Sequence, residues 1–254
     1  MDADETRLLA LGTRMLEAAG IGHADDDARA LVALFRRRAA REPLEYILGT
    51  CRFRGLDLLV DRRVLIPTEE RTGTLVVAAL DAPPGARVHE VGTGCGAVAL
   101  ALKAERPDLA VTGSDISADA VEVARENARR LGLDVGFRRA DGLPDGDFDL
   151  VLANLPYTDD AQVTQQLPPE QTEFQPGVAL WAGRDSLGLI RRLIAYAPAW
   201  TPLALEHGPH HTQELQGLLS DARTLCDARG DQRVTVGIAP AAPAATAAPG
   251  GGRP

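Results

Sequence analysis

A glycine-rich stretch, residues 90–96 with the sequence EVGTGCG, begins within a short apolar run and precedes residues typical of a helix. Glycines at such a position let the backbone turn tightly and let a ligand approach it, since no Cβ stands in the way. The first turn of the following helix also offers backbone N–H groups to an anion. The stretch therefore predicts a ligand site at the end of a strand.

Two further carboxylates stand where later strands are expected to end. Asp115 ends the expected strand 109–115, where a carboxylate can accept both hydroxyl groups of a ribose. Asp141 follows the expected strand 135–139, in a place to accept the exocyclic amine of an adenine. Because ligands of an open α/β sheet bind beyond the carboxyl ends of its strands, these acids and the glycines predict one nucleoside-containing cofactor.

Two cofactors fit the glycine pattern. Gly92, Gly94 and Ala97 satisfy the dinucleotide pattern G-x-G-x-x-G/A, which leaves an NAD-binding oxidoreductase as one interpretation. The acid Glu90 favours S-adenosyl-L-methionine, because an acid just before the glycines can meet the amino group of the methionine moiety. We predict S-adenosyl-L-methionine as the cofactor, with binding residues Glu90, Gly92, Thr93, Gly94, Gly96, Asp115, Ile116, Asp141, Gly142 and Asn154.

A second stretch with chemical character ends the expected strand 148–154. There Asn154-Leu155-Pro156-Tyr157 brings an amide, a fixed turn and an aromatic ring to one place. Taken alone, these residues also fit a strand that ends in an Asn-initiated turn, with the tyrosine in the core. The neighbouring glycine-rich stretch favours a functional motif instead.

With these motifs the chain resembles the HemK/PrmC family of protein-glutamine N5-methyltransferases, from about residue 42 to residue 238. The family carries N-P-P-Y where this chain has NLPY at 154–157. Residues 41–49 resemble the family's linker, 53–67 its hairpin and 168–187 its substrate-side loop. N-P-P-Y is also found in N6-adenine DNA methyltransferases, so the flanking segments carry the assignment.

The resemblance implies methyl transfer from S-adenosyl-L-methionine to a glutamine side-chain amide of a protein, such as the Gly-Gly-Gln loop of a peptide chain release factor. The predicted catalytic residues are then Asn154, Leu155, Pro156 and Tyr157. The Asn154 side-chain oxygen and the Leu155 carbonyl each accept one N–H of the target amide, which orients the nitrogen and favours its developing positive charge. Pro156 fixes the turn, and Tyr157 is a flat wall for the amide.

The chain departs from the family pattern on the substrate side. Leu155 replaces the first proline of the motif, Thr68 and Glu69 replace an Arg-Pro pair, and the N-terminal helical region is about half the usual length. Three alternatives stay open: a methyltransferase of a small molecule or secondary metabolite, one acting on adenine N6, and a non-catalytic partner protein that binds S-adenosyl-L-methionine. The acidic charge opposes the adenine alternative.

The elements that must position these residues alternate between strand and helix. Apolar runs predict strands at 88–91, 109–115, 135–139, 148–154, 202–206 and 233–238, and helices at 97–104, 117–131, 186–197 and 212–228. This alternation predicts an α/β fold with a doubly wound, mostly parallel sheet. The family resemblance implies that this is the Rossmann-like fold of the class I S-adenosylmethionine-dependent methyltransferases. Further patterns predict helices at 3–20 and 25–41 and a β-hairpin within 52–66.

The same patterns divide the chain into four parts. We expect an N-terminal helical substrate-docking region at 1–42, a linker with the β-hairpin at 43–72, and the methyltransferase domain at 73–238. Residues 239–254 are rich in Ala, Pro and Gly and predict a disordered tail.

The charge of the chain limits the classes of partner that we expect. A net charge of -9 over 254 residues argues against direct nucleic-acid binding. The one basic cluster, Arg36-Arg37-Arg38 with Arg41, fits a solvated helix end or a docking patch for an acidic or RNA-bearing partner. We therefore expect a protein substrate or a small-molecule acceptor. The sequence does not define an oligomeric state.

The cysteines, the histidines and the hydropathy of the chain bear on metal binding and on cellular location. Three separated cysteines without C-x-x-C exclude a disulfide scaffold and a cysteine zinc site. His207, His210 and His211 lie close in sequence, but Gly208-Pro209 breaks any helical spacing, so we predict no metal. No apolar run approaches the ~18 residues of a membrane span and the N-terminus is acidic, which together predict a cytoplasmic protein.

Overall fold

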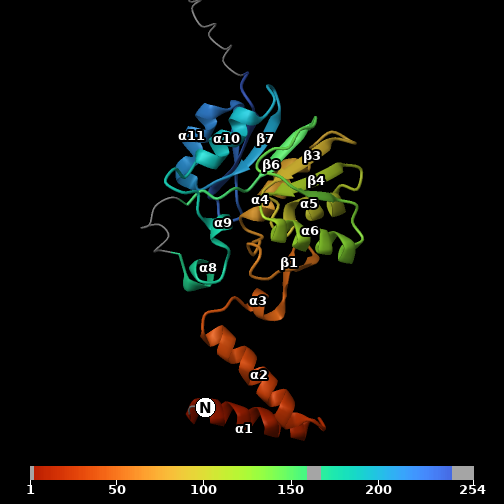
Figure 1. The fold of residues 1–254 in the computed structure, drawn as a ribbon, viewed down its shortest axis with the longest axis vertical. Coiled ribbons are helices and arrows are strands. Elements are labelled where there is room, and N and C mark those ends of the chain that lie inside the picture. Colours follow the sequence, from red (N-terminus) through yellow and green to blue (C-terminus); the bar gives the residue numbers. More distant parts are fainter. Residues whose placement is uncertain (1–2, 159–166, 242–254) are drawn as a thin grey trace, which may run out of the picture.

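A seven-stranded sheet forms the centre of the computed structural model, which describes residues 3–158 and 167–241 (Figure 1). The strands lie in the order β5-β4-β3-β6-β7-β9-β8. The strand bounds are β3 Arg87–Val91, β4 Ala110–Asp115, β5 Gly136–Arg139, β6 Leu150–Ala153, β7 Pro202–Glu206, β8 Ser220–Cys226 and β9 Gln232–Ile238. The first five are parallel, whereas β9 pairs antiparallel with β7 and β8. The predicted mostly parallel Rossmann-like sheet is confirmed.

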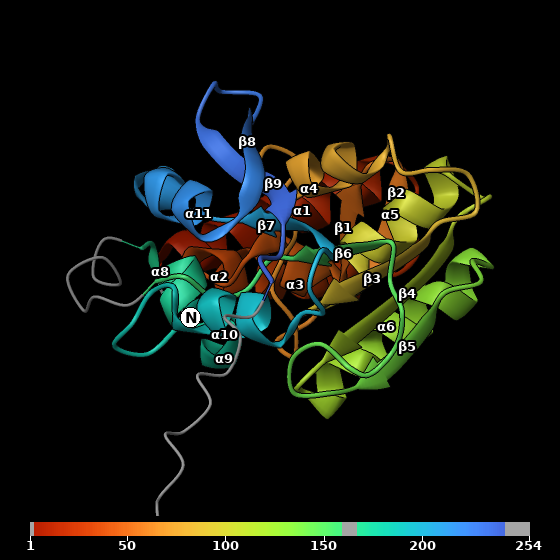
Figure 2. The same ribbon diagram turned by 90° about the horizontal axis from the view of Figure 1, so that it is seen from above.

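Helices pack on two sides of this sheet (Figure 2). One apolar core includes residues of α4 (Thr72–Ala79), α5 (Ala97–Glu105) and α6 (Ala118–Leu131). The other includes residues of α10 (Gly188–Tyr196) and α11 (Thr212–Leu218). Strand β6 contributes alternate side chains to the two cores, which is why it reads as a continuous apolar run.

The N-terminal helices project away from the sheet (Figure 1). Helices α1 (Ala3–Ala18) and α2 (Ala24–Ala39) pack against each other, and α1 has no buried residue. The chain then forms α3 (Leu44–Leu48) and a short hairpin of β1 (Thr50–Phe53) and β2 (Leu56–Leu59). Phe53 and Leu58 of this hairpin are fully buried in the first core, so the linker is part of the packed domain.

Several sequence-based expectations need correction. The predicted helix 212–228 ends at Leu218, and residues 220–226 form strand β8 on the edge of the sheet. The local residues favour a helix, but β9 supplies the hydrogen-bond partners of a strand, so tertiary pairing overrides propensity. The hairpin occupies only 50–59, with its turn at Gly55. The segment that resembles the family's substrate-side loop, 168–187, contains short helices α8 (Pro169–Thr172) and α9 (Gly177–Leu180).

The first residue of the predicted tail, residues 239–254, packs against the domain. Ala239 is buried and exchanges backbone hydrogen bonds with Trp200 and Thr201. Most of the predicted disordered tail, residues 242–254, lies outside the described residues. Within the described ranges, no helix is long and apolar enough to cross a membrane.

Candidate active site at the carboxyl ends of the strands

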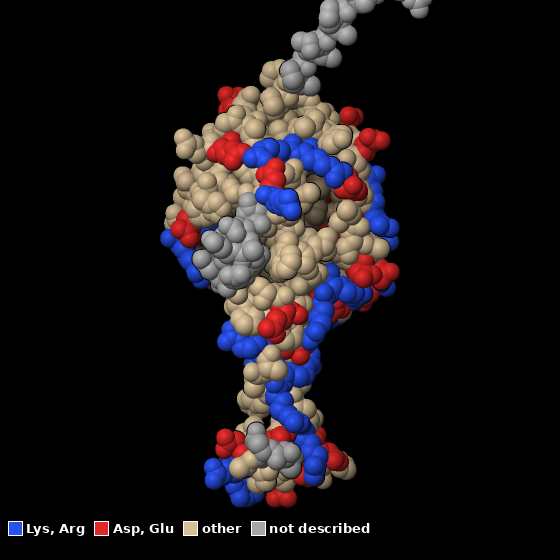
Figure 3. Space-filling view, turned by 60° about the vertical axis from the view of Figure 1, so that its left-hand side comes forward, with Lys and Arg blue, Asp and Glu red and all other residues tan. Residues whose placement is uncertain are grey.

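A cavity of about 410 Å³ opens where β3, β4 and β6 end. Figure 3 shows a hollow in one face of the domain, above the projecting N-terminal helices. The cavity brings together all of the predicted cofactor-binding residues except one: its lining includes Glu90, Gly92, Thr93, Gly94, Asp115, Ile116, Asp141, Gly142 and Asn154. Residues from four separate stretches of sequence therefore meet as expected for one ligand site.

The exception is Gly96, which does not line the cavity. A Cβ on Gly96 would lie 3.0 Å from side-chain atoms of both Leu100 and Phe137. Gly96 also has φ of 84°, in the left-handed region that favours glycine. Its role in the structure is to let α5 pack closely against its neighbours.

The backbone N–H groups of the glycine loop turn inward. Gly92 and Thr93 both donate to the Ser114 carbonyl, at 2.8 and 2.9 Å, and Gly94 donates to Asp115 Oδ2 at 2.9 Å. These three loop N–H groups are therefore not available to an anion. A pyrophosphate requires such donors, so the loop suits a nucleoside cofactor without phosphate better than a dinucleotide.

Glu90 lies at the wall of this cavity and is buried. Its Oε2 accepts hydrogen bonds from Thr93 Oγ1 at 2.6 Å and from the Ala99 N–H at 3.1 Å. Burial raises the pKa of Glu90 to about 8, and the nearby charge of Asp115 adds to the shift, while the two hydrogen bonds oppose it. A carboxyl group in this state gains by meeting a cationic ligand group.

The other two acids differ in their surroundings. Asp115 holds the loop and the start of α6 together, because Oδ1 accepts from the Ser117 N–H at 2.9 Å while Oδ2 accepts from Gly94. Asp141 is exposed and accepts from Arg192 Nη2 at 2.9 Å. Arg192, from α10, also lines the cavity, and the sequence held no signal for it because its partner lies 51 residues away.

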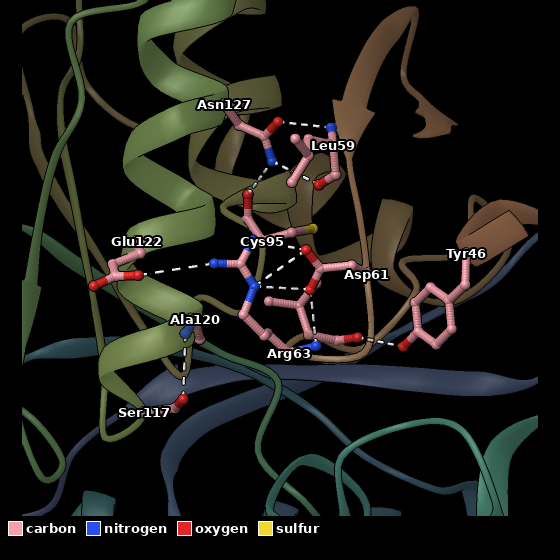
Figure 4. A network of polar contacts seen from close by, with 10 residues as sticks. Tyr46, Leu59, Asp61, Arg63, Cys95, Ser117, Ala120, Glu122 and Asn127 are labelled. Atoms are coloured by element: carbon pink, nitrogen blue, oxygen red, sulfur yellow. Dashed lines mark hydrogen bonds and ion pairs between the residues drawn. The ribbon is translucent and has the colours of Figure 1, made fainter. Parts of the chain in front are cut away.

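A polar network fastens the linker to the glycine loop (Figure 4). Asn127 of α6 is fully buried, and its Nδ2 donates to the Cys95 carbonyl at 2.9 Å and to the Leu59 carbonyl at 3.0 Å. Its Oδ1 accepts from the Leu59 N–H at 2.7 Å. In the same network Arg63 pairs with Asp61. One side chain thus joins β2, α6 and the loop that forms the cavity.

A second cavity, of about 470 Å³, adjoins the first. Both are lined by Asn154, Leu155 and Pro156, whereas Tyr157 lines only the second. The motif therefore forms a partition, with one chamber on each side. The two chambers are suited to hold two different molecules whose reacting atoms meet at Asn154.

Leu155, the departure from N-P-P-Y, packs against the glycine loop. A Cβ on Gly92 would lie 2.9 Å from Leu155 Cδ2 and 3.7 Å from the Asn154 carbonyl oxygen. The leucine therefore occupies the space that glycine leaves, and the partition rests directly on the loop.

Sequence reasoning did not assign a role to Glu206, the last residue of β7. It is buried, lines the second cavity, and its Oε2 has no hydrogen-bond partner among the described residues. Burial raises the pKa of Glu206 to about 7, opposed by the charges of Arg71 and Arg233 and by a hydrogen bond from Tyr157. An acid that ends an apolar strand was the signal that identified Asp115, and it applies equally here.

Among the neighbouring histidines, His207 is held by hydrogen bonds within the protein. His207 is buried, with Nε2 2.8 Å from Thr235 Oγ1 and Nδ1 2.8 Å from the Gly208 carbonyl oxygen. Burial lowers the pKa of His207. No group of three or more ligating side chains suited to a metal ion occurs in the part of the chain that the structure describes.

The Rossmann-like sheet, the glycine loop that begins with the acid Glu90, and the partition formed by the Asn154 motif together define a class I methyltransferase. Two solved structures share this fold: the hMettl16 catalytic domain in complex with MAT2A 3′UTR hairpin 6 (TM-score 0.57, 16% identity, 72% of this chain and 74% of that one) and a methyltransferase from Pyrococcus furiosus (TM-score 0.50, 18% identity, 82% and 95%). The family model "Methyltransferase small domain" matches residues 70–171.

Relatives in sequence are more specific. A release factor glutamine methyltransferase of Geobacter sulfurreducens is 35% identical over 84% of this chain and 78% of its own length. Those of Deinococcus radiodurans (38% identity, 82% and 76%) and Xylella fastidiosa (36% identity, 94% and 90%) match similarly. The chain belongs to the release factor glutamine methyltransferase family.

Proposed function

We propose that this chain transfers the methyl group of S-adenosyl-L-methionine to the side-chain nitrogen of a glutamine in a peptide chain release factor. The observation that carries the proposal is the partition: Asn154, Leu155 and Pro156 line both cavities. The sulfonium of the cofactor, when bound, supplies an electrophilic methyl group. We infer the acceptor from the relatives, which are release factor glutamine methyltransferases.

The first cavity is assigned to the cofactor. Glu90 would meet the ammonium group of the methionine moiety, since its carboxyl group is buried and both of the protein hydrogen bonds it accepts are at Oε2. Asp115 lies at the end of β4 for the ribose. Ile116 and Gly142 would flank the adenine, with Asp141 accepting from its amine.

The second cavity is assigned to the target glutamine. An amide nitrogen is a poor nucleophile, because its lone pair is delocalised into the carbonyl. The Asn154 side-chain oxygen and the Leu155 carbonyl would accept its two N–H groups and aim the nitrogen at the first cavity. Tyr157, which lines only this chamber, would form the flat wall.

The remaining parts of the chain take supporting roles in this proposal. Residues 1–42 dock the protein substrate, and residues 43–72 fix the wall of the site to the domain at 73–238. A cytoplasmic location fits these assignments, since Cys51, Cys95 and Cys226 are free thiols.

The decisive experiment is mass spectrometry of a release factor after incubation with the protein and S-adenosyl-L-methionine. We expect one added methyl group on the glutamine of its Gly-Gly-Gln loop. A release factor with asparagine at that position is the matched control and should gain none. Calorimetric binding of the cofactor without transfer to the release factor would contradict the proposed acceptor and direct the search to small molecules.

A further inference from the structure

Glu206 stands at the floor of the second cavity. Strand β7 lies between β6, which ends at the Asn154 motif, and β9, where Glu206 is in register with Val234. The residue is only 2% exposed, yet it lines the cavity that holds Tyr157. A buried carboxyl group thus lies at the carboxyl end of β7 and lines the chamber assigned to the acceptor.

The charged neighbours of Glu206 are engaged elsewhere or lie farther away. Arg233 pairs with Asp227 at 3.2 Å and donates to the His207 carbonyl at 3.4 Å. Within residues 3–158 and 167–241 there is no ion pair to Glu206, although Arg71 also lines the cavity. Glu206 Oε2 is therefore a buried acceptor without a donor.

A second buried acceptor lines the same chamber. Gln175, which follows α8, has an Oε1 that is inaccessible and without a described hydrogen-bond partner. A buried polar atom left without a partner destabilises the folded state, so proteins retain few of them. Two such atoms beside one cavity point to a ligand that supplies the missing donors.

We propose that Glu206 and Gln175 are acceptor-binding residues, which take backbone N–H donors from the polypeptide that carries the target glutamine. This inference rests on the proposed function. The two N–H groups of the target amide are already matched by Asn154 and Leu155, so the donors for Glu206 and Gln175 must come from the flanking chain. Glycines beside the glutamine leave their N–H groups accessible, since they carry no side chain. The pair of acceptors therefore selects a glycine-flanked peptide over a free amide.

The variants Glu206→Leu and Glu206→Gln test this role, with Glu126→Leu as the control on the exposed face of α6. Leucine removes the acceptor, whereas glutamine keeps one acceptor oxygen. We expect Glu206→Leu to raise the KM for the release factor about tenfold, as loss of one charged hydrogen bond predicts, and Glu206→Gln to raise it less. The calorimetric Kd for S-adenosyl-L-methionine should stay within about twofold of the unmodified protein. An unchanged KM in Glu206→Leu, or a parallel loss of cofactor affinity, overturns the inference.

Thermal unfolding separates this inference from the proposed function. If the unmodified protein transfers no methyl group to a release factor, the proposed function fails on its own. The Tm then still tests Glu206: its buried Oε2 has no partner among the described residues of the free protein, so both variants should unfold at a higher temperature. A lower Tm in both variants shows that partners within the protein hold Glu206, and this result overturns the inference.

Discussion

Asn154 is the residue on which both chambers converge, because it directly follows β6 and lines each of them. We expect Asn154→Ala to lower kcat by about 10²–10³-fold, the usual loss when an oriented acceptor or donor is removed from a reacting group. Cofactor affinity should change little, since Glu90 and Asp115 are retained. Steady-state kinetics and calorimetry measure the two effects, and equal losses in both would count against the orienting role.

Glu90 makes cofactor binding depend on pH. Its pKa in the free protein is raised to about 8, so the carboxyl group is mostly protonated at pH 7. An ammonium group beside it requires the carboxylate, and releasing the proton costs about tenfold in affinity for each pH unit below 8. We therefore expect the Kd for S-adenosyl-L-methionine to tighten roughly tenfold between about pH 6.5 and 7.5.

The variant Glu90→Gln supplies the control for this dependence. It removes the titrating group, so its weaker affinity should be nearly constant over the same pH range. Calorimetric titrations in buffers of different ionisation enthalpy would also count the released proton. A flat profile in the unmodified protein would show that Glu90 does not meet a cationic group.

At the scale of elements, the contact between the glycine loop and the motif is tested by Gly92→Ala. The new Cβ would lie 2.9 Å from Leu155 Cδ2, at φ of 74°. Gly85→Ala is the matched control, because Gly85 has φ of 75° and open space around its missing Cβ. Both variants should lose about 1–2 kcal/mol of stability in chemical denaturation, the cost of a left-handed residue with a side chain.

Only Gly92→Ala should also impair methyl transfer, because only there is the partition displaced. Adding Leu155→Ala removes the colliding methyl group, so the double variant should recover part of the lost rate. Equal activity of Gly92→Ala and Gly85→Ala would show that the loop and the motif are not coupled.

The elements were predictable where an apolar run ends in a chemically distinct residue. Strands β3, β4 and β6 were located this way. The predicted start of the helix at 117 also agrees, because Ser117 caps α6 and accepts from the Ala120 N–H at 3.2 Å. Strand β8 was not, because its residues gain strand structure only from pairing with β9. Asp61-Arg62, a turn candidate in the sequence, does begin a turn, in which the Val64 N–H donates to the Asp61 carbonyl at 3.1 Å, but this turn lies outside the hairpin.

The candidate site was likewise predictable from the sequence only in part. The predicted cofactor residues follow one another at strand ends, so the rule for parallel sheets was enough to bring them together. Asn127 and Arg192 bond across large separations in sequence, Gln175 lines the second cavity, and none of the three belongs to a recognisable motif. Their contribution could be found only from the packed structure.

At the scale of the whole molecule, one ion-pair cluster joins the N-terminal helices to the substrate side. Glu170 of α8 accepts from Arg38 at 3.0 Å and from Arg41 at 2.7 Å, and both Arg38 and Glu170 line the second cavity. Figures 1 and 2 place α8 beside the segment that follows α2. The basic cluster therefore has a partner within the chain, besides its exposure along the projecting helices (Figure 3).

We expect Glu170→Ala to leave stability within about 1 kcal/mol of the unmodified protein, because exposed ion pairs contribute little. The KM for the release factor should rise severalfold, since the wall of the second cavity is no longer fixed. Glu126→Ala, which removes an exposed pair on α6, is the control and should not change it. Added salt should raise the KM of the unmodified protein but not that of Glu170→Ala, and an equal salt response in both would contradict this role.

The position of β9 has a consequence for how the protein is made. Strand β7 carries Glu206, and its free edge is covered only by β9, whose residues 232–238 leave the ribosome some thirty residues later. The glycine loop, β6 and the Asn154 motif can associate well before that. The cofactor chamber is therefore able to form on the nascent chain, while the acceptor chamber is completed only after β9 has been synthesised.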